Sequence, residues 1–522
     1  MTGWQRWMRR GIVLSARVAP LRYLLRGVCQ LLTWEVGREL ANLPGVEAVY
    51  TRHSHPASTT FAPGLSDIDL TVVISDSAAH DAPSLRISSN RVDTVARTVP
   101  FVWAQDARFV SRNELAQIEE HPGTAEILYV PAGWMRIGGR EVRRGGPAPS
   151  VDTKRILLHP EFNVWWHHVM QTHVLTPRTD REESSARFCS RVAMKNQLHL
   201  QVARGRWTPR IDGYLPDSDA KALFADDFTM VRLLDEQAHQ GAAHNPEDWE
   251  AEILHRSLYD AGSFYRELPI SSDAAWITLR PRSEAIDEGH RVKLREIFDR
   301  EEALRSIAAG AIVYPTPHWM RREYQIDLIL RDNIAGEAFR EAVRAIKRSL
   351  GGRTFGVGDT DAQLTLIPRF AFQHPWFYLG TPFPLLHEHV ASSAETLFGN
   401  PPRLPAPPSV AERRRWCATY FLFHRFTLHY RPAYVSKDCN FSQLLALRTF
   451  LEDGTILTDA ADIYRRYVNA LGTRSEDLTA LNFLTGIARE PLDDESFAAA
   501  LNLQSQEYDA VEALLRRAGV HP

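Results

Sequence analysis

Two aspartates that stand two residues apart, Asp67 and Asp69, are the side chains best suited to chemistry in this chain. They belong to the segment GLSDIDLTVVI (64–74), whose apolar, β-branched second half predicts a strand. Side chains two residues apart on a strand share a face, so the two carboxylates would be neighbours. Adjacent anions resist burial unless a cation lies between them. The pattern predicts a Mg²⁺ site, because Mg²⁺ prefers carboxylate oxygens and often binds together with substrate phosphates.

The elements around this pair are those of a small α/β domain. Apolar residues recur at helical spacing over 21–43 and predict a helix, and VEAVY (46–50) predicts a short strand after it. Another strand is predicted at 101–110, after the one that carries the aspartates. Ser111 is expected to begin a helix, because Glu114 three residues later completes a capping box.

The order of helix, short strand, polar loop and strand with D-x-D resembles the nucleotidyltransferase superfamily of the DNA polymerase β type. It is most similar to the aminoglycoside nucleotidyltransferases and their small bacterial relatives. VEAVYTRHS (46–54) occupies the first part of the family motif and SDIDL (66–70) the second, and GWMRIGGREV (133–142) is similar to a later family segment. The resemblance covers roughly residues 30–145. It implies an α/β (α+β) fold with a mixed sheet flanked by helices.

The resemblance also implies which residues contact the nucleotide. Ser54 falls where the family serine contacts the phosphates, and Ser66 opens the second part of the motif. His53 stands where the family has glycine, which lets backbone amides approach a phosphate closely. A histidine there either narrows the pocket or adds a phosphate contact of its own. Lys195, in a helix predicted within 187–207, is a further candidate for a phosphate contact, or else an exposed residue on that helix.

A third carboxylate is implied on a later strand. Asp67 and Asp69 correspond to the family's metal ligands, and Asp106 is the candidate for the third acid. In some members this group binds metal, and in others it is the general base that takes a proton from the acceptor hydroxyl. Asp93 and Glu114 are alternative candidates.

The reaction that the resemblance implies is Mg²⁺-dependent nucleotidyl transfer. A nucleoside monophosphate would pass from ATP or another nucleoside triphosphate to a hydroxyl of an acceptor, with release of pyrophosphate. The acceptor is a small molecule, a protein side chain or an RNA end, as in tRNA-end enzymes. The alternative is a non-catalytic nucleotide-binding or regulatory protein that retains the nucleotidyltransferase fold, which the histidine at position 53 favours.

Composition and pattern divide the rest of the chain. We expect a catalytic domain at 1–150, a helical domain at 151–265 and a second α/β unit of unknown role at 266–400. The proline-rich segment NPPRLPAPP (400–408) then leads to a C-terminal helical domain at 409–522.

One strand within the second α/β unit allows two interpretations. YQIDLIL (324–330) carries Asp327 after AIVYPTP (311–317), as in a degenerate second copy of the first domain. Gln325 stands where the first acid of a pair would be, so an ordinary strand with one polar position is the favoured interpretation.

Overall composition is that of a globular protein, with 44% hydrophobic and 24% charged residues. The net charge of −3 gives the whole chain no strong attraction for nucleic acid. The four cysteines form no CxxC pair and no zinc spacing, which favours the reducing cytoplasm. No apolar run reaches transmembrane length, so no membrane span is expected.

The first 34 residues contain six arginines and no acidic residue before Glu35. This composition suits a transit peptide, a helix at a membrane surface, or a basic amphipathic helix that packs on the first domain. Pro20 interrupts the segment and serine is not abundant in it, so packing on the domain is the favoured interpretation.

Overall fold

In a computed structural model, the chain forms two compact units. Unit 1 comprises Met1–Leu157, Thr208–Asp217 and Cys417–Pro522, and unit 2 comprises Leu158–Trp207 and Ser218–Trp416. The described residues are 3–16, 18–52, 56, 61, 63, 68–99, 101–102, 107–120, 134–144, 251–252, 254–255, 276–277, 286–316, 324–349, 355–357, 360–369, 386–400, 404–405, 409–411, 413–414, 417–418, 421, 430–432, 440–457, 459–469, 475–488 and 490–520.

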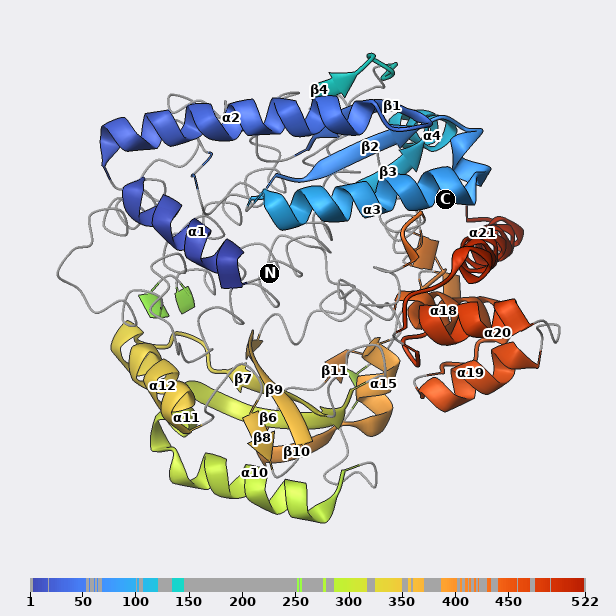
Figure 1. The fold of residues 1–522 in the computed structure, drawn as a ribbon. Helices are drawn as coiled ribbons and strands as arrows, with labels where there is room; N and C mark the ends of the chain where they lie inside the picture. Colours follow the sequence, from blue (N-terminus) through green and yellow to red (C-terminus); the bar gives the residue numbers. More distant parts are fainter. Residues whose placement is uncertain are drawn as a thin grey trace. The chain divides into compact units, whose positions relative to one another are not determined.

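Unit 1 contains a four-stranded mixed sheet with strand order β3-β2-β1-β4 (Figure 1). β1 runs antiparallel to both β2 and β4, and β2 runs parallel to β3. The parallel pair is joined through helix α3, as parallel neighbours require a crossover. The elements are α1 (Gly3–Ser15), α2 (Ala19–Ala41), β1 (Val46–Thr51), β2 (Leu70–Ile74), η1 (Ala78–His80), α3 (Ala82–Thr98), β3 (Arg108–Ser111), α4 (Arg112–Glu120) and β4 (Met135–Gly139).

The hydrophobic core of unit 1 lies on the helix-covered face of this sheet. Alternate residues of the central strand, Leu70, Val72 and Ile74, pack in one buried cluster with residues of α2 and α3, among them Leu40 and Val92. Because side chains alternate along a strand, Thr71 and the preceding Asp69 belong to the opposite face.

Most of the sequence-based elements of this region are confirmed. The strand expected at 101–110 is the exception, because β3 begins only at Arg108, Val102 forms an isolated bridge with Ile68, and residues 103–106 lie outside the described residues. The helix at 21–43 is α2, the strand at 46–50 is β1, and the segment after the D-x-D motif is β2. The capping box is present, because Ser111 N donates to Glu114 Oε2 at 2.7 Å and Glu114 N donates to Ser111 Oγ at 3.2 Å. The fold class is therefore mixed α/β, as predicted.

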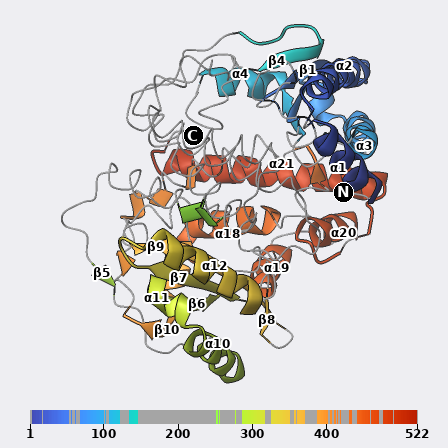
Figure 2. The same ribbon diagram turned by 90° about the vertical axis from the view of Figure 1, so that its left-hand side faces the viewer.

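Helices from the C-terminal part of the chain complete unit 1, with the long helix α21 beside α18 and α20 (Figure 2). α21 also packs on α3, where Arg86 pairs with Asp494 and lies 5.7 Å from the ring centre of Phe497. The helices are α18 (Asn440–Asp453), α19 (Ala460–Val468), α20 (Ser475–Leu484) and α21 (Asp494–Arg517). Both ends of the chain thus belong to one compact unit, while the division into four sequence segments stays a prediction. Almost all of segment 151–265 lies outside the described residues.

Unit 2 contains a five-stranded sheet with order β10-β6-β7-β9-β8 and a two-stranded sheet of β11 and β5. β6 runs antiparallel to β7 and to β10, and β7 runs parallel to β9. The elements are β5 (Trp276–Ile277), α10 (Glu288–Arg300), α11 (Glu302–Ile307), β6 (Ala308–Pro315), β7 (Tyr324–Leu330), α12 (Gly336–Ser349), β8 (Phe355–Val357), β9 (Thr360–Pro368), α15 (Leu386–Ser393), β10 (Glu395–Gly399) and β11 (Leu404–Pro405).

The four strands β9-β7-β6-β10 repeat the order and the directions of β3-β2-β1-β4. The registers also agree. The pairing of β1 with β2 shifts between Val46 and Ala48, and the pairing of β6 with β7 shifts between Ala308 and Gly310. The pairing of β1 with β4 and the pairing of β6 with β10 each contain a further register shift, and these two shifts lie at equivalent positions.

Two glycines extend this correspondence to backbone conformation. Gly139 ends β4 with φ of +70° and pairs with Ala48, and Gly399 ends β10 with φ of +71° and pairs with Gly310. A Cβ at either glycine would overlap the backbone of the neighbouring strand. A side chain at such a position meets both a disfavoured φ and a blocked space. These matches support the second-copy interpretation of YQIDLIL over that of an ordinary strand.

Candidate functional site

Of the predicted site residues, the structure describes Asp69. The other two predicted acids, Asp67 and Asp106, lie outside the described residues. The same holds for the four predicted nucleotide contacts, which are His53, Ser54, Ser66 and Lys195. The site is therefore built from Asp69 and the strand residues that surround it.

Asp69 lies directly before β2 and next to the end of β1. Its carbonyl oxygen accepts a hydrogen bond from Arg52 N at 3.0 Å, which continues the β1–β2 pairing by one residue. Ile68 before it and Leu70 after it are both fully buried in the helix-covered core. The alternation places Asp69 on the other face of the sheet, where its side chain is partly exposed.

Arg52 is the closest basic residue to this acid in the register. Its side chain is only 6% exposed, and its Nη1 donates to the carbonyl oxygen of Leu70 at 3.1 Å and to Thr71 Oγ1 at 3.2 Å. These bonds hold the guanidinium over the start of β2 on the face of Asp69. An arginine keeps its charge at all physiological pH values, so this face carries a permanent cation beside the acid.

Two more arginines belong to the same face through strand pairing. Thr71 is paired with Arg108 of β3 and with Tyr50 of β1, and Tyr50 is paired with Arg136 of β4. Laterally paired residues share a face of a sheet. Arg108 of β3, Arg136 of β4 and Arg52, which directly follows β1, thus belong to the face that bears Asp69. Such a group of planar cations suits the oxygens of a phosphate chain.

A hydrogen-bonded cluster follows this face along β1. Tyr50 Oη donates to Glu141 Oε1 at 2.8 Å, and Arg143 Nε donates to the same oxygen at 2.7 Å. The Arg143 guanidinium lies 4.9 Å from the centre of the Tyr50 ring. The hydrogen bond from Arg143 lowers the pKa of Glu141 to about 2, and burial raises the pKa of Tyr50 to about 12. The cluster stiffens the tyrosine that lies between Thr71 and Arg136 in the register.

The alternative candidates for the third acid have structural roles in the described residues. Asp93 on α3 accepts a hydrogen bond from Arg431 Nη2 at 2.7 Å. Glu114 caps α4 through the backbone amide of Ser111. Asp106 is two residues before Arg108, and it stays the predicted third acid.

The sequence pattern did not indicate Arg52, Arg108 or Arg136 as site residues. The one local signal was a charged residue in otherwise apolar strands, as in ARFV (107–110). Their convergence depends on how three strands pair, and periodicity within a single strand does not report this.

The equivalent face of unit 2 has different chemistry. Gln325 occupies the register position of Asp69, and Asp327 that of Thr71. Gln325 Nε2 donates to Asp327 Oδ1 at 3.2 Å and to Thr365 Oγ1 at 2.7 Å, and all three residues are buried. The positions of the three arginines are held by Tyr314, Thr365 and Thr396. The second face therefore has neither the acid at the start of the central strand nor the three arginines.

Within the part of the chain that the structure describes, no group of three His, Cys, Asp or Glu side chains is placed to hold a metal ion. Asp69 is the described member of the predicted acid cluster, and it is accompanied by cations and hydroxyl groups. The described side chains alone thus suit anion binding more than metal binding, and a metal at this face would need Asp67 as well.

Comparison with known proteins gives no relative: no family model, no curated protein and no solved structure matches this chain.

Proposed function

We propose that unit 1 is a Mg²⁺-dependent nucleotidyltransferase that transfers a nucleoside monophosphate from ATP or another nucleoside triphosphate to a hydroxyl of an acceptor, with release of pyrophosphate. The observation that carries the proposal is that Asp69 shares one face of the first sheet with three arginines: Arg52 directly after β1, Arg108 of β3 and Arg136 of β4. The D-x-D spacing and the resemblance of residues 30–145 to the nucleotidyltransferase superfamily supply the reaction type.

Each residue of the proposed site has one role in the transfer. Asp67 and Asp69 would hold Mg²⁺, which supplies charge neutralisation at the phosphates. Arg52, Arg108 and Arg136 bind phosphate oxygens and orient the chain for in-line displacement.

On the opposite side of the transfer, Asp106 takes the proton of the acceptor hydroxyl or completes the metal site. The histidine and the serines of the two motif segments, His53, Ser54 and Ser66, belong to the phosphate site of unit 1.

The non-catalytic interpretation suits the second sheet better than the first. In unit 2 a neutral amide replaces the acid, and its NH₂ group is already bonded to Asp327 and Thr365. An amide donor bonded to the neighbouring carboxylate competes with any cation for that oxygen. We therefore expect one catalytic centre per chain.

The test uses the full-length protein, Mg²⁺ and nucleotides labelled at the α-phosphate, with pyrophosphate release measured against candidate acceptors. Asp69→Asn and Asp67→Asn should each abolish transfer, because one carboxylate alone is a poor Mg²⁺ site. Arg52→Met should weaken binding of the triphosphate about tenfold or more, since each charge-assisted hydrogen bond contributes roughly 1.5–3 kcal/mol. Asp462→Asn, at an exposed position of α19, is the matched control. Unchanged turnover in both motif variants would refute the proposal.

A further inference from the structure

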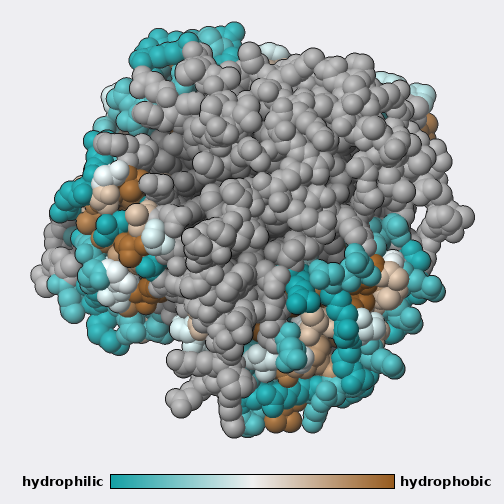
Figure 3. All heavy atoms as spheres, turned by 180° about the vertical axis from the view of Figure 1, so that it is seen from behind, coloured by the Kyte–Doolittle hydropathy of each residue, from teal (hydrophilic) through white to brown (hydrophobic). Residues whose placement is uncertain are grey.

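Exposed large hydrophobic residues are concentrated at the beginning of the chain. Eleven of the sixteen among the described residues lie between Trp4 and Trp34, on α1, on α2 and between them. Elsewhere they are scattered singly, and Figure 3 shows a described surface that is mainly hydrophilic with small hydrophobic areas. A local concentration of exposed apolar side chains marks a binding surface more often than scattered ones do.

The exposed residues of α2 form a stripe. Leu21, Leu24, Val28 and Leu31 are spaced by three, four and three residues, so they lie on one side of the helix. Leu24 is 63% exposed and Leu31 is 72% exposed. A different side of α2 packs into the core through Cys29, Val36 and Leu40. One side of α2 thus packs on the first domain, as the favoured interpretation of the sequence expected. The other side of the helix is apolar and exposed.

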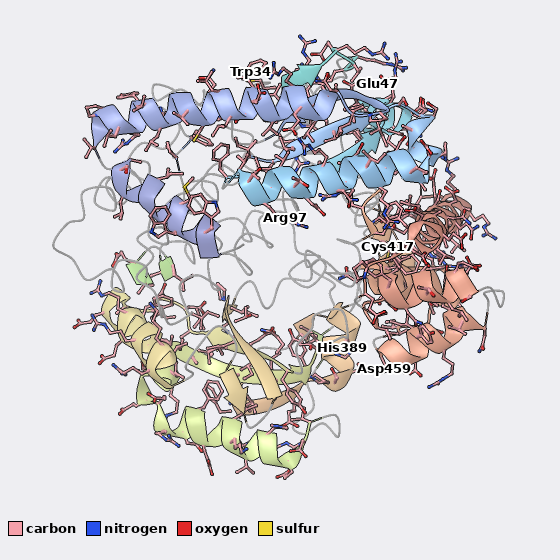
Figure 4. The ribbon with its side chains drawn as sticks, in the orientation of Figure 1. Trp34, Glu47, Arg97, His389, Cys417 and Asp459 are labelled. Atoms are coloured by element: carbon pink, nitrogen blue, oxygen red, sulfur yellow. The ribbon has the colours of Figure 1, made fainter. Side chains whose placement is uncertain are left out.

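Aromatic residues extend the apolar surface onto α1. Trp4 and Trp7 are both exposed, and their rings stack with centroids 5.6 Å apart. Tyr23 is exposed on α2, and Trp34, labelled in Figure 4, is exposed further along the same helix. Tryptophan and tyrosine are the side chains that prefer the boundary between lipid and water.

The charge of the segment is uniformly positive. Residues 1–34 contain six arginines and no acid, although the whole chain has a net charge of −3. Two of these arginines donate to backbone carbonyl oxygens, Arg22 to Ala16 at 2.9 Å and Arg26 to Phe61 at 2.9 Å and 3.0 Å. A carbonyl oxygen carries no net charge, so these contacts leave the positive charge of the segment in place.

We propose that α1 and the exposed side of α2 form a docking surface for an anionic lipid bilayer. An apolar stripe, aromatic residues and clustered arginines are the combination that lets a helix lie in the interfacial layer of negatively charged membranes. A second copy of this chain fits less well as the occupant, because pairing the two stripes would bring two segments of the same charge together.

The test is flotation of the full-length protein with vesicles of mixed phosphatidylglycerol and phosphatidylcholine, and with vesicles of phosphatidylcholine alone. Binding to the anionic vesicles is expected, with a loss in high salt because the arginine contribution is screened. The double variant Leu24→Glu/Leu31→Glu should bind about tenfold more weakly or worse, since two apolar anchors are lost and two negative charges are gained. Ile87→Glu and Ile487→Glu, at exposed hydrophobic positions outside the segment, are matched controls.

Two results would overturn this proposal. One is failure of the wild-type protein to float with anionic vesicles while it remains folded by circular dichroism. The other is equal flotation of the double variant and the wild type. A dimer that forms without vesicles and is lost in the double variant would assign the surface to a second copy instead.

Discussion

A buried arginine from the C-terminal part of unit 1 should stabilise the sheet that bears the candidate site. Arg431 is 1% exposed, its Nη2 donates to Asp93 Oδ1 at 2.7 Å and its Nη1 donates to the carbonyl oxygen of Ala107 at 2.9 Å. The guanidinium also lies 5.7 Å from the ring centre of Phe109. Arg431 thus ties α3 and β3 to a segment more than 300 residues away in the chain.

The expected loss follows from these contacts. Arg431→Met removes a charge-assisted hydrogen bond of roughly 1.5–3 kcal/mol and a donor to a buried carbonyl of roughly 1–3 kcal/mol. Partial relaxation makes the total smaller than the sum, so we expect a loss of about 3–4 kcal/mol in the free energy of unfolding of unit 1. Asp93→Asn should cost only about 1 kcal/mol, because Asp93 is 26% exposed and an amide oxygen still accepts the hydrogen bond.

The assay is urea unfolding of the single variants and the double variant, with hydrogen exchange at α3 and β3 to assign the transition to unit 1. The double variant should lose about 1–2 kcal/mol less than the sum of the single variants, since the two residues form one ion pair. Arg465→Met, at an exposed position of α19, is the matched control and should change stability by less than about 0.5 kcal/mol. A loss for Arg431→Met as small as that of the control, or strict additivity, would refute this reasoning.

Three further predictions concern the site, the repeated backbone and pH. Titration of the full-length protein with Mn²⁺ should reveal a single strong site, which Asp69→Asn removes and Gln325→Ala leaves intact; a site that survives Asp69→Asn would contradict one centre per chain. Gly399→Ala should lower the free energy of unfolding of unit 2, measured in urea, by about 2 kcal/mol or more, because its φ is positive and a Cβ would overlap β6. The loss should be clearly larger than that caused by Gly454→Ala, where φ is also positive but the space around the residue is open. Equal losses would show that the overlap is unimportant. Burial raises the pKa of Tyr50 from 10.0 to about 12, so the folded state binds this proton more tightly than the unfolded state does. The contribution of the protonated tyrosine to the free energy of unfolding is therefore fully present below pH 10 and should be lost as the pH rises towards 12. Tyr50→Phe should remove that part of the pH dependence in urea unfolding measured on either side of pH 10, and an unchanged slope would refute the assignment.

Local sequence patterns were sufficient to predict the helices and strands next to Asp69. The helical repeat of α2, the β-branched run of β2 and the capping box at Ser111 each depend on residues close in sequence, and each is present. The membership of residues 417–522 in unit 1 depends instead on contacts such as Arg431 with Asp93, between residues far apart in the chain. No property of either segment alone reports such a pairing.

The sequence pattern did not show that the two sheets share one strand order, and the reason is physical. The D-x-D motif belongs to the polar face, and that face differs in unit 2. The shared features are strand order, two register shifts and a glycine with positive φ at the end of the edge strand, as at Gly139 and Gly399. These features constrain the backbone and leave little trace in residue type, apart from the glycine itself.

The second sheet shows that the three arginines of the first sheet are not a requirement of the fold. Tyr314, Thr365 and Thr396 stand in unit 2 at the register positions of the three arginines, and the sheet keeps the same order and bulges. The topology therefore does not require arginine at these positions. Burying a guanidinium such as that of Arg52 has a desolvation cost, which an uncharged residue at the same position avoids. A cost that the fold does not require favours a ligand-binding role for this face, and the arginines that share the face with Asp69 suit an anionic ligand such as a phosphate group, in line with the proposed function.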